Sequence, residues 1–83
     1  MKFIAKINIM PLKEILDPQG KAVTGSMKNL GLDMIANVRI GKHIQLEVEA
    51  ENENEARNNV DEACKQLLAN QIMEYYTFEL TPA

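Results

Sequence analysis

Hydrophobic and polar residues alternate over residues 2–10, a pattern typical of a β-strand with one buried face. The predicted buried face consists of Phe3, Ala5, Ile7 and Ile9. The other face carries Ile4, Lys6, Asn8 and Met10. We expect Pro11 to end this strand, because proline has no N–H for the hydrogen bonds of a sheet.

Helical spacing replaces this alternation after Asp17. Small and apolar residues recur three or four positions apart at Val23, Ser26, Met27 and Leu30. Asp17 is a favoured N-cap residue, Pro18 suits the first helical position, and Gly31 suits a left-handed helix end. We therefore predict a helix over residues 18–30. Its two internal glycines make it depend on packing rather than on intrinsic propensity.

Residues 34–50 show two further alternating runs, which predict a hairpin that turns near Gly41. The apolar positions are Ala36, Val38 and Ile40 in the first run and Ile44, Leu46, Val48 and Ala50 in the second. A two-residue loop at Gly41-Lys42 would place the two apolar sets on opposite faces. The burial pattern instead sets Ile40 opposite Ile44, so we expect a three-residue loop or a bulge over residues 41–43.

The most regular helical stripe lies within residues 52–69. It consists of Ala56, Val60, Ala63, Cys64, Leu67 and Leu68. Asn52 is the predicted N-cap, and Asp61 and Lys65 have the spacing of a helical ion pair. Alternation then resumes after Asn70, at Ile72, Tyr76, Phe78 and Leu80. It predicts a last strand that ends before Pro82.

The order of these elements is β-α-β-β-α-β, which favours one ferredoxin-like α+β domain over residues 1–83. In that fold a four-stranded antiparallel sheet carries two helices on one face, and the other face is open. Proteins with this fold include regulators, enzymes and RNA-binding modules, so the fold alone selects no function.

Size and charge narrow the classes of partner. A domain of 83 residues buries little more than about 60% of its unfolded surface, so association with other chains is expected. A net charge of −3 and a pI near 5.0 argue against nucleic-acid binding. No apolar run approaches the roughly 20 residues of a membrane span, and the single cysteine forms no internal disulfide. We expect a cytoplasmic protein that binds neither nucleic acid nor a membrane.

The DPQG stretch at residues 17–20 is a candidate anion site, because helix N-termini offer free N–H groups. Pro18 removes one donor, however, and the Asp17 carboxylate lies where an anion would bind. A structural helix start or a protein contact is therefore favoured over phosphate binding. The basic cluster of Arg39, Lys42 and His43 is either an anion site or a solvated turn.

The remaining candidates favour structural interpretations. His43 is the only histidine, so no metal-binding constellation accompanies it. Cys64 lies on the apolar helical stripe, where a buried thiol is expected. RNA binding of the kind that needs stacked aromatics is disfavoured, because the strand HIQLEVEA has none.

Three stretches together resemble the PurS family, the small subunits of phosphoribosylformylglycinamidine synthase in purine biosynthesis. They are LDPQGKAV at residues 16–23, VRIGKHIQLEVEA at 38–50 and LLANQIMEYYTFEL at 67–80. The resemblance covers nearly the whole chain. The combination of DPQG-x-AV with VR-x-GK-x-I is far more specific than any single dipeptide in it.

The resemblance implies an assembly subunit that is not an enzyme on its own. In this family the small subunit joins a glutaminase subunit, which releases ammonia, and a large synthetase subunit, which uses ATP. It is expected to be a dimer or tetramer, to bridge the other two subunits and to aid ammonia transfer. Glutamine, ATP and Mg are then used by the partner subunits, and this chain is expected to bind no cofactor or metal and to carry no catalytic residue.

The expected partner contacts combine the family motif with exposed positions of the predicted elements. They are Asp17, Pro18, Gln19, Gly20, Lys21, Arg39, Gly41, Lys42 and Tyr75. Gly20 is expected to allow a partner close approach, and Arg39 to pair with an acidic group of a partner chain.

Two other functions fit the same order of elements. A regulatory module similar to ACT domains would bind a small molecule at a subunit interface. A small enzyme similar to acylphosphatase would need a basic anion-binding loop after the first strand, where this chain has Asp17 and Pro18.

Overall fold

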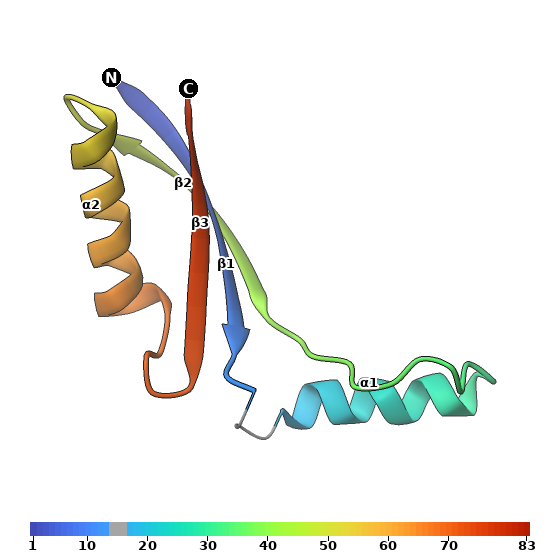
Figure 1. Cartoon of the computed structure of the whole chain (residues 1–83). Coiled ribbons are helices and arrows are strands. Elements are labelled where there is room, and N and C mark those ends of the chain that lie inside the picture. Colours follow the sequence, from blue (N-terminus) through green and yellow to red (C-terminus); the bar gives the residue numbers. More distant parts are fainter. Residues whose placement is uncertain (14–16) are drawn as a thin grey trace.

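A computed structural model of the chain describes residues 1–13 and 17–83. The described elements are β1 (Lys2–Pro11), α1 (Pro18–Asn29), β2 (Lys42–Glu49), α2 (Glu53–Ala63), the π-helical turn η1 (Cys64–Leu68) and β3 (Glu74–Pro82). The strands form an antiparallel sheet in the order β2-β1-β3. Figure 1 shows α2 alongside this sheet, whereas α1 projects away from its lower end.

β1 is the central strand, and the apolar residues of its alternating pattern form the centre of the core. Ile7 lies opposite Ile44 of β2 and Phe78 of β3. Buried with Ile7 are Ala5, Ile9, Val60, Cys64 and Ala69, and a second buried cluster consists of Phe3, Ala50 and Ala56. The predicted first strand and its buried face are therefore confirmed, although the strand extends to Pro11.

The second predicted helix is confirmed, with a change at its end. The backbone N–H of Glu55 donates to the Asn52 side chain at 2.8 Å, so Asn52 is the N-cap. Lys65 Nζ lies 3.0 Å from Asp61 Oδ2, as the spacing predicted. From Cys64 the helix widens into η1, which ends when the Ala69 N–H donates to the Cys64 carbonyl at 3.0 Å.

The predicted first strand of the hairpin is wrong. Residues 35–41 are irregular, with a φ of 56° at Asn37, and they pair with no strand in the part of the chain that the structure describes. They run back along α1, where the Val38 N–H donates to Thr24 Oγ1 and the Ile40 N–H donates to Asp17 Oδ2. The side chains of Thr24 and Asp17 thus accept hydrogen bonds that the N–H groups of a fourth strand would have donated to the sheet.

The expected turn at residues 41–43 is also absent, because Lys42 is the first residue of β2. Gly41 instead packs against the end of β1, where a Cβ would overlap the Ile9 carbonyl and the Met10 sulfur. A four-stranded sheet with two helices on one face is therefore replaced by three described strands with α2 on one face. The last strand includes Pro82, opposite Phe3, where it lies on an edge that tolerates proline.

α1 and the segment that returns from it form an arm, which we define as residues 17–41. Gly31 has a φ of 77° and turns the chain back after α1, as predicted. The molecule measures 52 × 26 × 14 Å, and its radius of gyration is 16.4 Å. A compact chain of this length has a radius of gyration of about 12 Å. The arm therefore makes this chain unusually elongated.

No helix in the described residues is long and apolar enough to cross a membrane.

Candidate functional site

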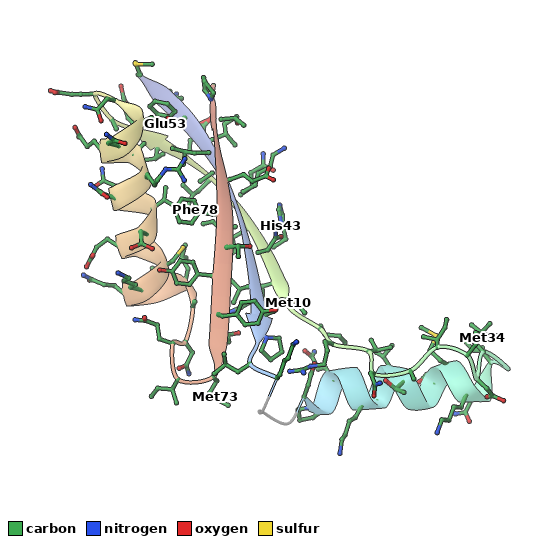
Figure 2. All side chains as sticks on the ribbon, viewed as in Figure 1. Met10, Met34, His43, Glu53, Met73 and Phe78 are labelled. Carbon is green, nitrogen blue, oxygen red and sulfur yellow. The ribbon has the colours of Figure 1, made fainter. Side chains whose placement is uncertain are left out.

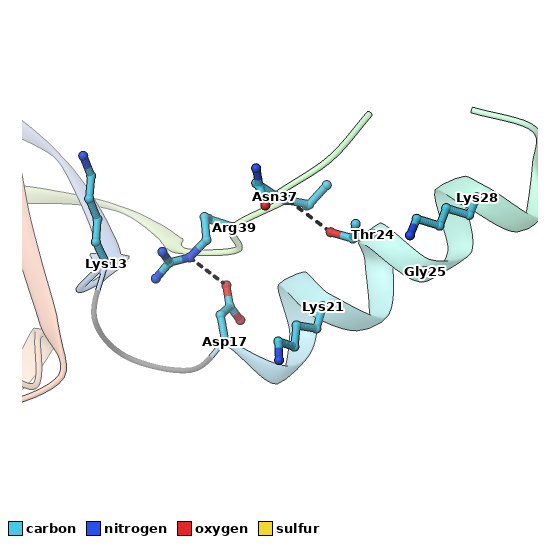
Figure 3. A pocket seen from close by; sticks show the side chains of 9 residues that line it. Lys13, Asp17, Lys21, Thr24, Gly25, Lys28, Asn37 and Arg39 are labelled. Atoms are coloured by element: carbon cyan, nitrogen blue, oxygen red, sulfur yellow. Dashed lines mark hydrogen bonds and ion pairs between the residues drawn. The ribbon is translucent and has the colours of Figure 1, made fainter. Parts of the chain in front are cut away.

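Asp17 joins the start of α1 to the return segment at the base of the arm. Its Oδ1 accepts the Gly20 N–H at 3.0 Å, and its Oδ2 accepts the Ile40 N–H at 2.9 Å. Arg39 Nε lies 3.6 Å from Oδ2 (Figure 3). The two backbone N–H groups, helped by the Arg39 charge, lower the pKa of Asp17. The carboxylate is thus an ionised internal ligand, and it uses the donors that a bound anion would need.

Arg39 ties the same region to the end of β1. Its Nη2 donates to the Leu12 carbonyl at 2.7 Å and to the Pro11 carbonyl at 3.3 Å. The guanidinium therefore has its acidic partner, Asp17, within its own chain. The LDPQGKAV block lies at this junction, although Leu16 is outside the described residues.

The rest of that block divides between the arm's interior and its surface. Gly20 is buried, and a Cβ on it would overlap the Val38 carbonyl oxygen. The close approach expected at Gly20 is thus made by the chain's own return segment. Pro18, Gln19 and Lys21 are exposed and remain candidates for contact with another chain.

The remaining candidates lie nearer the sheet. Gly41 packs on β1, and Lys42 points to the α2 side, where Nζ is 3.6 Å from Glu74 Oε2 and 3.4 Å from the Leu68 carbonyl. Tyr75 lies on β3 and is 45% exposed. The structure therefore brings Asp17, Gly20, Lys21 and Arg39 together, with Gly41 and Lys42 following the return segment. Tyr75 lies beside Gly41 and Lys42, opposite Met10 of β1.

An open hollow of about 700 Å³ lies along the arm (Figure 3). Its lining is formed by Lys13, Asp17, Lys21, Thr24, Gly25, Lys28, Asn37, Val38 and Arg39. Sequence reasoning missed Lys13, Thr24 and Lys28. The spacing of residues 21, 24 and 28 along one helical face was the available signal for two of them.

The chain was also compared with known proteins. The family described as "PurS: Phosphoribosylformylglycinamidine (FGAM) synthase" matches residues 4–82. The chain belongs to the PurS family. The subunit PurS of phosphoribosylformylglycinamidine synthase from Synechocystis is 48% identical over 67 residues, which are 81% of this chain and 67% of that one.

Solved structures of the PurS family agree with the fold. PurS from Thermus thermophilus is 40% identical, with a TM-score of 0.82 over 100% of this chain and 99% of that one. A chain of the PurLQS structure from Thermotoga maritima is 31% identical, with a TM-score of 0.89 over 98% and 99%. The ACT-like alternative is not favoured by these matches.

His43 and Cys64, the other candidates in this PurS family member, have surroundings that the fold itself supplies. His43 Nδ1 and Asn8 Oδ1 lie 2.7 Å apart on the open face of the sheet. Burial raises the pKa of the Cys64 thiol, as expected for a packed cysteine. Within residues 1–13 and 17–83, no three His, Cys, Asp or Glu side chains lie close enough to share a metal ion.

Exposed apolar side chains gather at the end of the sheet where α2 finishes and β3 begins. We call Leu67, Ile72, Met73 and Tyr75 the end patch. Leu67 and Ile72 are 82% and 83% exposed. Figure 2 shows Met73 at this end and Met34 at the far tip of the arm. The PurS fold thus exposes apolar groups at two separate places, as an interaction subunit requires.

Proposed function

We propose that this chain bridges the glutaminase subunit and the ATP-dependent synthetase subunit of phosphoribosylformylglycinamidine synthase and aids ammonia transfer between them. As a member of the PurS family, it is a non-catalytic subunit of this ligase complex of purine biosynthesis. The observation that carries the proposal is the match, over nearly the whole chain, to a chain of the PurLQS structure.

The proposed contact residues gather at the end of the sheet from which the arm projects. Asp17, Pro18, Gln19, Gly20, Lys21, Arg39, Gly41 and Lys42 follow the base of the arm, and Tyr75 of the end patch lies beside this base on β3. Asp17, Gly20 and Arg39 hold the arm together and act as positioning residues in this proposal. Exposed Gln19, Lys21 and Tyr75 are its direct contacts.

The proposal includes self-association as a dimer or tetramer. The arm supports it, because a helix of 12 residues is marginal in water unless its apolar side is covered. Leu30 and Met34 on the arm are 73% and 78% exposed, so a second copy has apolar surface to cover. In this proposal the chain works in the cytoplasm and binds no cofactor or metal, while glutamine, ATP and Mg serve the partner subunits.

Reconstitution with purified glutaminase and synthetase subunits tests the bridging role. We expect synthesis from glutamine to require this chain, and synthesis from added ammonium salt to depend on it much less. A Tyr75→Glu variant should lose glutamine-dependent synthesis. Thr81→Glu, on the same face of β3 at its other end, is the matched control. Full glutamine-dependent synthesis without the chain would contradict the proposal.

A further inference from the structure

The hollow on the arm is basic, and its charges are only partly compensated. Lys13, Lys21, Lys28 and Arg39 surround it, and we call this the basic hollow. Its lining carboxylate, Asp17, already binds two backbone N–H groups and Arg39. Within the described residues the three lysines make no ion pair. Three positive charges therefore face an open concave surface.

The spacing of these charges suits an extended acidic segment. Lys21 and Lys28 are seven residues apart on α1, which is about two turns and roughly 10 Å. Gly25 lies between them, and a Cβ there would meet nothing within 4 Å. The space between the two lysines is therefore open, and Figure 3 shows them along the same helix. An acidic segment that lies along α1 would bring carboxylates to both ammonium groups.

The same molecule carries an acidic segment at its other end. Five exposed glutamates occur within nine residues, Glu47, Glu49, Glu51, Glu53 and Glu55, and we call residues 47–55 the acidic end. Glu47 is paired with Lys2 at 3.9 Å and Glu53 with Arg57 at 3.6 Å. The other three glutamates make no ion pair within the part of the chain that is described.

The two charged surfaces lie at opposite ends of an elongated molecule. Figure 1 places the start of α2 beside the chain termini and the arm at the far end of the sheet, and Figure 2 shows Glu53 at the first of these ends. Two copies related by a two-fold axis and lying antiparallel would set each basic hollow against the other copy's acidic end. Both contacts then form at once, so the assembly closes rather than growing into a filament.

We infer that the acidic end of a second copy of this chain docks in the basic hollow. This inference rests on the self-association included in the proposed function, and it adds the residues and the orientation. Charge complementarity sets the orientation and the rate of pairing, while the exposed apolar residues of the arm supply contact area. Because the charges are exposed, association should weaken as salt is added.

Charge reversal tests the pairing in the full-length chain by sedimentation velocity. A Lys21→Glu/Lys28→Glu variant and a Glu49→Lys/Glu55→Lys variant should each associate at least tenfold more weakly than the unmodified chain. An equimolar mixture of the two variants should associate again. In a mixed pair, the hollow that is now acidic faces the end that is now basic, and the other contact is unchanged. Lys6→Glu/Lys65→Glu has the same change in net charge as the first variant and should associate normally.

The outcomes separate this inference from the proposed function. Circular dichroism first establishes that each variant is folded. If the unmodified chain is a monomer, the proposed self-association itself is wrong. If it associates but the variants associate equally well, or if the mixture is not restored, only the docking of the acidic end is overturned. The Lys21→Glu/Lys28→Glu variant could also self-associate normally but no longer bind the synthetase or glutaminase subunit. The basic hollow would then be a binding site for that subunit, and the inference would be overturned.

Discussion

At the scale of single residues, Asp61 connects two elements through one carboxylate. The Tyr76 hydroxyl of β3 donates to Asp61 Oδ1 at 2.5 Å, and Lys65 Nζ lies 3.0 Å from Oδ2. Both contacts favour the ionised acid and lower the pKa of Asp61. The same hydrogen bond holds the phenol proton and raises the pKa of Tyr76 to about 12.

This contact predicts a pH dependence that can be followed on one chromophore. In a Tyr75→Phe variant, Tyr76 is the remaining tyrosine, and its ultraviolet absorbance reports its ionisation. We expect a midpoint near pH 12 in the folded chain, against the ordinary value of 10.0. The contact then stabilises the fold fully below pH 10, and its contribution is lost as the pH rises toward about 12.

The comparison for this titration is the same chain with Asp61→Asn. Without the carboxylate, the midpoint of Tyr76 should fall toward 10. Equal midpoints in the two chains would show that Asp61 does not hold the phenol proton.

Residue roles that depend on near neighbours in the sequence were predicted correctly. Asp17 before Pro18 is a local helix signal, and the Asp61–Lys65 pair lies within one helical turn. The contacts of Arg39 and Gly20 were not predictable in the same way. Their partners are 18 to 28 residues away, and only the path of the return segment brings them together.

At the scale of elements, the arm shows why an alternating pattern is ambiguous. Residues 34–40 have the apolar alternation of a strand but do not form one, since Met34 lies in a turn and Asn37 has a φ of 56°. An alternating pattern does not specify which groups accept hydrogen bonds from the backbone N–H groups. Thr24 and Asp17 offer side-chain oxygens to the Val38 and Ile40 N–H groups, and these bonds replace the sheet ladder.

Two glycines of α1 provide a matched test of this arrangement. A methyl group at Gly20 would overlap the Val38 carbonyl and crowd the Asp17 carboxylate, so Gly20→Ala should separate the return segment from α1. Gly25→Ala meets no neighbour and should stabilise α1 by up to about 1 kcal/mol, because alanine has the higher helix propensity.

Hydrogen exchange of the Val38 and Ile40 amides measures this difference. Both amides should exchange faster in Gly20→Ala than in the unmodified chain, and no faster in Gly25→Ala. Retained protection in Gly20→Ala would mean that the return segment does not lie against α1 as described.

At the scale of the whole molecule, the arm and the sheet differ in how much of their surface is covered. β1 has a hydrogen-bonded strand on each side and α2 over its buried face. In α1, by contrast, Gly20 is the buried residue. Self-association would therefore protect the arm far more than it protects the sheet.

Hydrogen exchange at two protein concentrations should reveal this contrast. We expect arm amides to gain protection as concentration rises, because mass action populates the associated form. Amides of β1 should already be protected and should change little. Arm amides that exchange at the same rate over a wide concentration range would show that self-association leaves the arm uncovered.

The overall shape was the least predictable feature. The predicted β-α-β-β-α-β order was right about two helices and an antiparallel sheet, but three strands are described instead of four. It failed where it required α1 to fold back over the sheet, because no local pattern specifies whether a helix covers its own chain or another one. The radius of gyration of 16.4 Å records that difference.

The register of β1 has a consequence for how the chain is made. Phe3 pairs with Pro82, so the central strand gains its second neighbour only after residues 74–82 have left the ribosome. Such distant pairing slows folding and leaves apolar surface open meanwhile. A chain that stops before Glu74 lacks β3 entirely. The ribosome must therefore have released β3 before this subunit becomes resistant to aggregation and proteolysis.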